Sequence, residues 1–124
     1  MEALSGETAI RKHEIEAASA SQDTVNTLYI GGGTPSVLPL SVFTRIVKTL
    51  AGIGHGGPFD EFTVEVNPED IVEKGETYVE GLLELGVNRI SMGVQSFDDA
   101  TLKWMNRRHN SARAQQAYAI LEDA

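Results

Sequence analysis

The sequence of 124 residues contains no cysteine. Disulfides, zinc bound through cysteine and an iron–sulfur cluster held entirely by cysteine are therefore excluded within this chain. Basic residues are scarce as well, with 10 Lys and Arg against 18 Asp and Glu and a net charge of −8. The one basic run, Arg107-Arg108-His109, is too short to neutralise a phosphate backbone or an acidic membrane. We therefore expect no nucleic-acid partner.

Long apolar stretches are also missing. None approaches the roughly 18 residues that a bilayer-spanning helix needs, and the N-terminus carries acids without the apolar core of a signal peptide. These absences predict a cytoplasmic protein with no integral membrane segment. A hydrophobic content of 41% with 23% charged residues is ordinary for a globular domain.

Apolar periodicity alternates along the chain between the helical and the strand period, which predicts βα units around a parallel sheet. Strands are expected at 25–30, 62–66 and 89–95. Helices are expected at 7–20, 39–50 and 78–85, with Gly86 just beyond the third. Asp98 or Asp99 would cap a further helix, and Ser111 would begin the last one. The outer strands, 25–30 and 89–95, would have open edges, and we expect either that the chain self-associates through them or that the N-terminal helix folds across one of them.

Side chains alternate within two of these strands. Thr63 and Glu65 separate the apolar residues of 62–66, and Ser91, Gly93 and Gln95 do the same in 89–95. A strand buried on both faces would be almost continuously apolar. The pattern favours a barrel with helices outside and a polar site inside, into which Glu65 and Gln95 point from the strand ends. A half-solvated sheet with Glu and Gln on its surface is the alternative.

A glycine-rich segment, Gly31-Gly32-Gly33-Thr34-Pro35-Ser36, directly follows the first predicted strand. Consecutive glycines allow positive φ and close approach of backbone to a ligand, so that free N–H and C=O groups can hold a carboxylate or an ammonium group. The segment matches neither the phosphate-binding P-loop nor the GxGxxG dinucleotide motif. By itself, a segment of this kind is more often an ordinary turn between strand and helix.

Four segments in sequence order resemble successive blocks of one family, the oxygen-independent coproporphyrinogen III oxidases and their haem-chaperone relatives among radical S-adenosylmethionine (SAM) proteins. They are LYIGGGTPS at 28–36, EVNP at 65–68, GVNRISMGVQSF at 86–97 and NRRH at 106–109. The resemblance implies a partial (β/α) TIM-like barrel of the radical SAM type, of which this chain supplies about three parallel strands with flanking helices. The variants QSFD and RRH lean towards the haem-chaperone branch.

The resemblance also implies a SAM site. Gly32, Gly33 and Thr34 match positions that contact the methionine moiety, Glu65 matches the SAM-binding acid, and Gln95 matches a SAM-site amide. Arg107 matches an arginine of the same site, although an exposed helical arginine is its alternative interpretation. A carboxylate can accept from ribose hydroxyls or pair with an ammonium group, and a guanidinium can grip a carboxylate. No catalytic residue and no metal ligand is assigned, and the three histidines are interpreted as solvated.

The family carries a CxxxCxxC motif whose thiolates hold a [4Fe–4S] cluster, and here no cysteine exists. We therefore expect residues 1–124 to be a fragment of a radical SAM core, without the cluster-binding segment and the C-terminal domain, and inactive alone.

In the complete protein the resemblance implies SAM and a tetrapyrrole as ligands. The implied chemistry is reductive cleavage of SAM to a 5′-deoxyadenosyl radical. The oxidases use that radical to decarboxylate propionate side chains, whereas the chaperones bind haem and deliver it. The sequence does not separate these two, and the competing class is a non-catalytic α/β module that binds a ligand through the Gly-rich loop.

Overall fold

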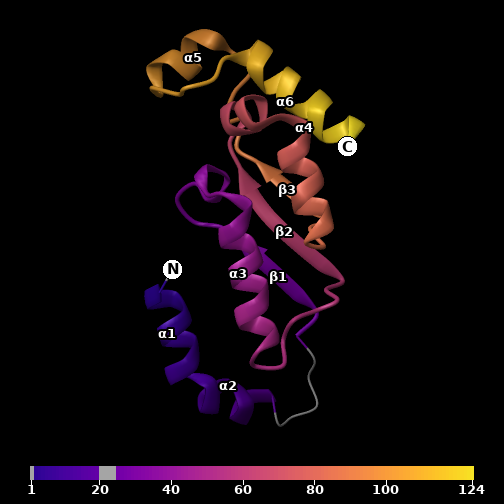
Figure 1. The fold of residues 1–124 in the computed structure, drawn as a ribbon. Helices are drawn as coiled ribbons and strands as arrows, with labels where there is room; N and C mark the ends of the chain where they lie inside the picture. The colour runs from indigo at the N-terminus through magenta and orange to yellow at the C-terminus, as the bar shows by residue number, and fades with distance from the viewer. Residues whose placement is uncertain (1, 20–24) are drawn as a thin grey trace.

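A computed structural model describes residues 2–19 and 25–124 and contains a parallel sheet of three strands (Figure 1). Strands β1 (Thr27–Ile30), β2 (Glu61–Val66) and β3 (Arg89–Met92) lie in the order β1-β2-β3. The α/β class, the parallel pairing and the two edge strands are therefore confirmed.

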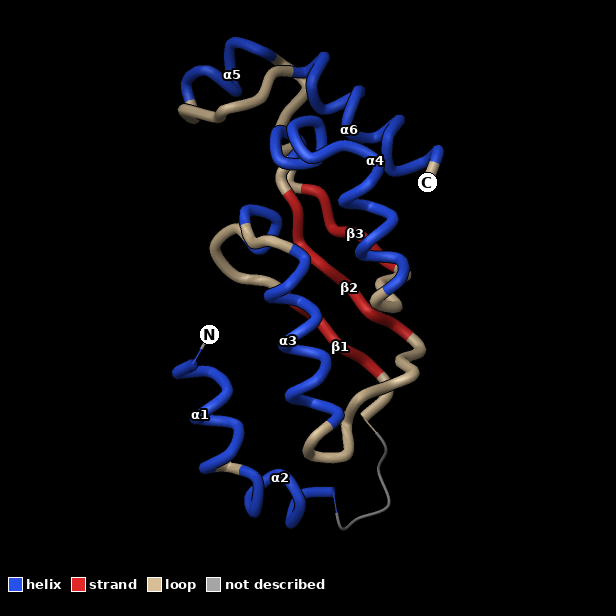
Figure 2. The backbone as a smooth tube through the Cα atoms, viewed as in Figure 1, coloured by secondary structure: helices blue, strands red, loops and turns tan. Residues whose placement is uncertain are grey.

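Helices α3 (Leu40–Ala51) and α4 (Pro68–Glu84) lie across the same face of the sheet (Figures 1 and 2). Helix α6 (Ser111–Asp123) packs on α4, and α5 (Asp99–Trp104) precedes it at the end of the molecule where β2 and β3 finish. The remaining helical elements are α1 (Glu2–Ile10), α2 (Lys12–Ser19) and the short 3-10 helix η1 (Pro35–Val37). Helix α1 lies beside α3.

The core lies between the central strand and the helices. Phe62, Val64 and Val66 of β2 are 0%, 0% and 3% exposed and pack with Phe43 of α3 and Leu82 of α4. Burying each of these side chains contributes about 1.5–3 kcal/mol before entropic costs. Their shared parity confirms that the odd and even positions of this strand face different environments.

Thr63 has the opposite parity and belongs to the predicted polar face of the strand, but it is fully buried. Its neighbours in register are Tyr29 on β1 and Arg89 on β3, which flank it across the central strand. Its hydroxyl donates to Glu61 Oε1 at 3.0 Å, so the buried polar group is satisfied.

The helix predicted at 78–85 begins earlier, at Pro68. Proline ends a strand because it has no N–H to donate, but the same property suits the first turn of a helix, and here Asn67 is the N-cap. Gly75 has φ 67° and ψ −168°, which divides α4 into two helical stretches. Its C-terminal end agrees with the prediction, since Gly86 has φ 92° directly after the C-cap Leu85.

Two other predicted boundaries were wrong. Strand β3 ends at Met92, because the N–H groups of Val94 and Ser96 donate to carbonyls two residues earlier and turn the chain. Near the N-terminus one helix was predicted, whereas α1 and α2 are separated at Arg11; Ala20 lies outside the described residues. Helix α1 has no buried side chain. The sequence therefore has no pattern of core positions from which the ends of this helix could be predicted. Asp98 caps α5, accepting from the Thr101 N–H, and Ser111 begins α6, both as predicted.

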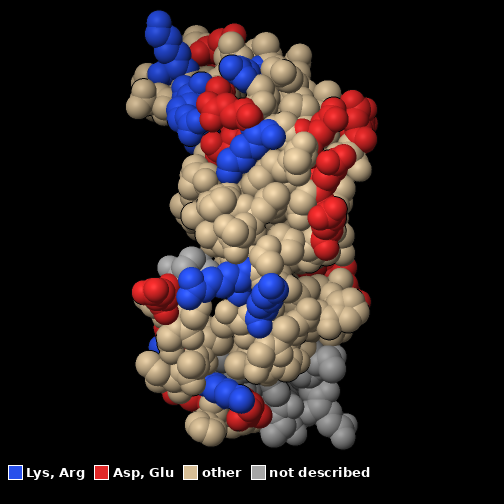
Figure 3. All heavy atoms as spheres, viewed as in Figure 1, with Lys and Arg blue, Asp and Glu red and all other residues tan. Residues whose placement is uncertain are grey.

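The surface carries the negative charge unevenly. Figure 3 shows acidic side chains gathered along the side of the molecule that α4 and α6 form. Within the described part of the chain, no helix is long and apolar enough to cross a membrane.

Candidate functional site

A polar pocket of about 290 Å³ opens where β2 and β3 end. Its lining comes from the Gly-rich loop, the ends of both strands and the turn after α5, namely from Gly33, Thr34, Pro35, Glu65, Val66, Asn67, Ser91, Gly93, Gln95 and Arg107. Five of the six residues proposed from sequence for the SAM site, Gly33, Thr34, Glu65, Gln95 and Arg107, meet in this one pocket. The sixth, Gly32, reaches it through a hydrogen bond to Glu65.

The Glu65 carboxylate is fixed at both oxygens. Tyr29 Oη donates to Oε1 at 2.5 Å, and the Gly32 N–H donates to Oε2 at 2.9 Å. The Tyr29 hydrogen bond and then the Gly32 N–H lower the pKa of Glu65 below its usual value, against a smaller opposing effect of burial. Glu65 is therefore a carboxylate near neutral pH, and each oxygen keeps lone-pair capacity for a ligand donor.

The Gly-rich loop owes its shape to residues without a Cβ. Gly32 and Gly33 have φ 85° and 61°, in the left-handed region that other residues rarely enter. This turn directs the Gly32 N–H at Glu65 and leads the chain into η1, which starts at Pro35. The loop contributes Gly33, Thr34 and Pro35 to the lining of the pocket.

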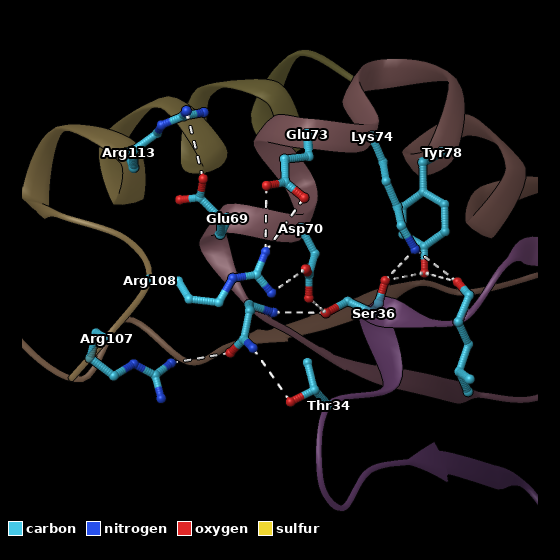
Figure 4. Close-up of polar contacts among 12 residues, drawn as sticks. Thr34, Ser36, Glu69, Asp70, Glu73, Lys74, Tyr78, Arg107, Arg108 and Arg113 are labelled. Carbon is cyan, nitrogen blue, oxygen red and sulfur yellow. Dashed lines mark hydrogen bonds and ion pairs between the residues drawn. The ribbon is translucent and has the colours of Figure 1, made fainter. Parts of the chain in front are cut away.

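Arg107 lies in the turn after α5, so the alternative of an exposed helical arginine is wrong. Its Nη2 donates to Gly93 O at 3.1 Å and to Asn67 Oδ1 at 3.1 Å, and Figure 4 draws the second of these contacts. Its Nε is buried and has no hydrogen-bond partner among the described residues. The guanidinium is therefore held through Nη2, and Arg107 lines the same pocket as Glu65.

A second set of polar contacts holds the loop against the start of α4 (Figure 4). Ser36, fully buried, donates through Oγ to Asp70 Oδ2 at 2.6 Å and accepts from the Asn67 N–H at 3.0 Å. Arg108 extends the set, because its Nη1 lies 3.4 Å from Asp70 Oδ1 and its Nη2 lies 3.4 Å from Glu73. The loop, the first turn of α4 and the turn after α5 are thereby joined.

Lys74 and Tyr78 close the same set on the α4 side. The Lys74 ammonium donates to the carbonyls of Ser36 and Leu38 and lies 4.3 Å from the Tyr78 ring centroid. Burial lowers the pKa of Lys74 and raises the pKa of Tyr78 to about 12. Both groups hold η1 in place without entering the pocket.

Sequence reasoning placed Gln95 on a strand, which is wrong. It follows the end of β3 with φ 67°, a conformation uncommon outside glycine, and reaches the pocket from a turn. Sequence reasoning also missed Asn67, Tyr29 and Ser91 as site residues. Asn67 belongs to the EVNP block, and Ser91 is a polar position of its alternating strand, as Glu65 is of its own. The sequence therefore contained a signal for both residues. It contained none for the contact between Tyr29 and Glu65.

The donor set fits one implied cofactor and not the other. One carboxylate, one guanidinium and free backbone groups suit a ligand with both an ammonium and a carboxylate, as the methionine part of SAM has. A [4Fe–4S] cluster does not fit, because the chain has no thiolate. Across the described residues, no three His, Asp or Glu side chains are grouped as metal ligands.

Comparison with known proteins defines the class. The model of the Radical SAM superfamily matches residues 9–124. The chain belongs to the radical SAM superfamily.

Individual proteins of the superfamily are similar to this chain. The haem chaperone HemW of Lactococcus lactis is 37% identical over 109 residues, which cover 88% of this chain and 28% of that protein. The oxygen-independent coproporphyrinogen III oxidase of Paracoccus denitrificans is 28% identical over 109 residues, covering 88% of this chain and 24% of that one. Among solved structures, coproporphyrinogen III oxidase (HemN) from Escherichia coli superposes with a TM-score of 0.66 at 28% identity, covering 81% of this chain and 22% of that chain. The chain thus spans about a quarter of the length of these relatives, and the partial TIM-like barrel fold is confirmed.

Proposed function

We propose that this chain forms the SAM-binding part of a radical SAM core in a protein of the coproporphyrinogen oxidase and haem-chaperone group. The observation that carries the proposal is the presence of Glu65 and Arg107 in one pocket beside the Gly-rich loop. Opposite charges in the lining of one small polar pocket suit the ammonium and carboxylate groups of an amino-acid moiety. Thr34 and Gln95 add neutral polar groups for the rest of the ligand.

The complete protein, in this proposal, also holds a [4Fe–4S] cluster on cysteines that this chain does not contain. When bound, such a cluster would supply the electron for reductive cleavage of SAM. This chain's residues bind and orient SAM, and the chain alone is inactive. Cytoplasmic location remains a prediction.

Between the two branches, we favour the haem chaperones. HemW relatives reach 37% identity with this chain, compared with 28% for the oxidase from Paracoccus denitrificans. Haem would then be the tetrapyrrole partner of the complete protein, and coproporphyrinogen oxidation is the second candidate. Haem titration and a vinyl-product assay on the complete protein separate the two.

Calorimetric titration of SAM into the chain tests the site. Glu65→Gln removes the charge and keeps the shape, and we expect it to weaken SAM binding roughly tenfold or more. Glu61→Gln is the matched control, since Glu61 is on the same strand and the same face but pairs with Arg89 at 3.0 Å outside the pocket. Equal affinities for the two variants would refute a role for Glu65.

The same variants distinguish the proposed SAM site from a module that binds a simple anion. Such a ligand would be attracted by Arg107 and repelled by Glu65, so Glu65→Gln would strengthen binding of inorganic phosphate. SAM binding should change in the opposite direction. A variant that loses SAM affinity without gaining phosphate affinity supports the proposed site.

A further inference from the structure

Tyr29 does not line the pocket, but its side chain contacts Glu65, an acidic residue of the lining. In register, Tyr29 of β1 is opposite Thr63 of β2, and Glu65 lies two residues further along the same face. Diagonal neighbours of this kind are within reach of a long aromatic side chain. The Tyr29 hydroxyl lies 2.5 Å from Glu65 Oε1, although the Tyr29 side chain as a whole is exposed.

Gly31 makes this contact sterically possible. A Cβ built on Gly31 would collide with the Tyr29 ring edge and come within 2.9 Å of Glu65 Cδ. Gly31 has no positive φ, so backbone conformation does not explain a glycine here. The missing side chain leaves the space in which the Tyr29 ring and the Glu65 carboxylate meet.

We propose that Tyr29 is a positioning residue: together with the space at Gly31 and the Gly32 N–H, its hydroxyl holds the Glu65 carboxylate in one orientation towards the pocket. Its relevance to ligand binding rests on the proposed SAM site. With one oxygen held by Oη and the other by a backbone N–H, the carboxylate cannot rotate without losing a hydrogen bond to a charged acceptor. A ligand then meets a fixed acceptor and does not have to order it.

The contact has an electrostatic signature. The hydrogen bond lowers the pKa of Glu65 and raises the pKa of Tyr29. Other charged groups near this face are Arg107 across the pocket, and Arg89 and Glu61, which pair with each other. Removing the hydroxyl should therefore raise the pKa of Glu65, so that ligand binding fails at a higher pH when the solution is acidified.

Tyr29→Phe in the full chain tests this, with the Glu65 side-chain carboxyl followed by ¹³C NMR titration in the absence of SAM. We expect the pKa of Glu65 to rise and SAM affinity at neutral pH to fall roughly three- to tenfold. Tyr118→Phe is the matched control, because Tyr118 also donates to a glutamate, Glu122 at 3.4 Å, but on α6. An unchanged Glu65 titration in Tyr29→Phe would overturn the proposal.

Gly31→Ala provides a second variant that keeps the tyrosine but fills the space. It should raise the pKa of Glu65 as Tyr29→Phe does, and normal titration in both variants rules the positioning role out. If wild-type chain does not bind SAM, the proposed function fails while the titration still decides the role of Tyr29. If wild type binds SAM and Tyr29→Phe binds equally well at every pH, the carboxylate orientation is irrelevant to the ligand and the proposal fails.

Discussion

Arg107 Nη2 lies 3.1 Å from Asn67 Oδ1, which ties the turn after α5 to the N-cap of α4. Asn67 also reaches back to the Gly-rich loop, since its amide Nδ2 lies 3.5 Å from Thr34 Oγ1 and its N–H donates to Ser36. It lines both the main pocket and a neighbouring one of about 180 Å³. Asn67 therefore connects the two loops that bound the site, through its side chain and its backbone N–H.

Replacing this asparagine should affect the ligand through Arg107. Asn67→Ala removes the acceptor, so we expect SAM affinity to fall roughly three- to tenfold in calorimetry. Asn67→Asp keeps an acceptor for Arg107 and should retain more affinity than Asn67→Ala. Equal losses in both variants would show that the Arg107 contact is not what matters.

Ser36→Ala should lower the free energy of unfolding by about 1–3 kcal/mol, because it leaves the buried Asp70 carboxylate and the Asn67 N–H each short of a partner. Urea denaturation followed by circular dichroism measures the loss. Ser41→Ala, on the exposed side of α3, is the control and should stay within about 0.5 kcal/mol of wild type. A Ser36→Ala variant as stable as that control would contradict the prediction.

Acid should loosen the start of α5. Asp98 accepts from the Thr101 side chain and N–H, which lower its pKa below the usual 3.8. A depressed folded-state pKa means that this contribution is complete above pH 3.8 and is lost as pH falls through the lower folded value. Amide exchange at Thr101 should accelerate in that range. Asp98→Asn still caps but does not titrate, and its exchange should lack this pH step.

Reconstitution with iron and sulfide should leave the chain without a cluster, since three thiolates cannot be replaced by its side chains. Visible absorption and iron analysis check this. Stoichiometric iron with the charge-transfer absorption of a [4Fe–4S] cluster would contradict it.

Self-association through the sheet edges remains a prediction. Strands β1 and β3 each have one side without a partner strand in the described chain, and open edges recruit other strands. Helix α1 faces β1 across an apolar groove of about 360 Å³ that α3 completes. Light scattering should detect dimers whose formation protects β1 or β3 amides from exchange. A monomer with rapidly exchanging edge amides would exclude association.

Sequence alone predicted the sheet and the core well, because alternate residues of a strand share a face and this alternation can be read from a few neighbouring residues. Phe62, Val64 and Val66 had to share a face whatever surrounded them. For the same reason, the alternation predicted that Glu65 points to the other face of this strand. The sequence-based prediction failed at Pro68, because the missing N–H of proline is compatible both with the end of a strand and with the first turn of a helix. It also failed at Gln95, because no local sequence pattern predicts its left-handed φ. Tyr29 could not be found, because its partner is 36 residues away and only the register of β1 on β2 brings them together.

Helix α4 combines loop contacts and core packing on both sides of its interruption at Gly75. Before Gly75, Asp70 and Lys74 contact the loop while Ile71 is in the core; after it, Tyr78 contacts the loop while Val79 and Leu82 are in the core. The position of the Gly-rich loop is therefore tied to the packing of the whole helix. In related chains, we expect substitutions at the loop-contacting positions of this helix to be accompanied by substitutions at its core positions.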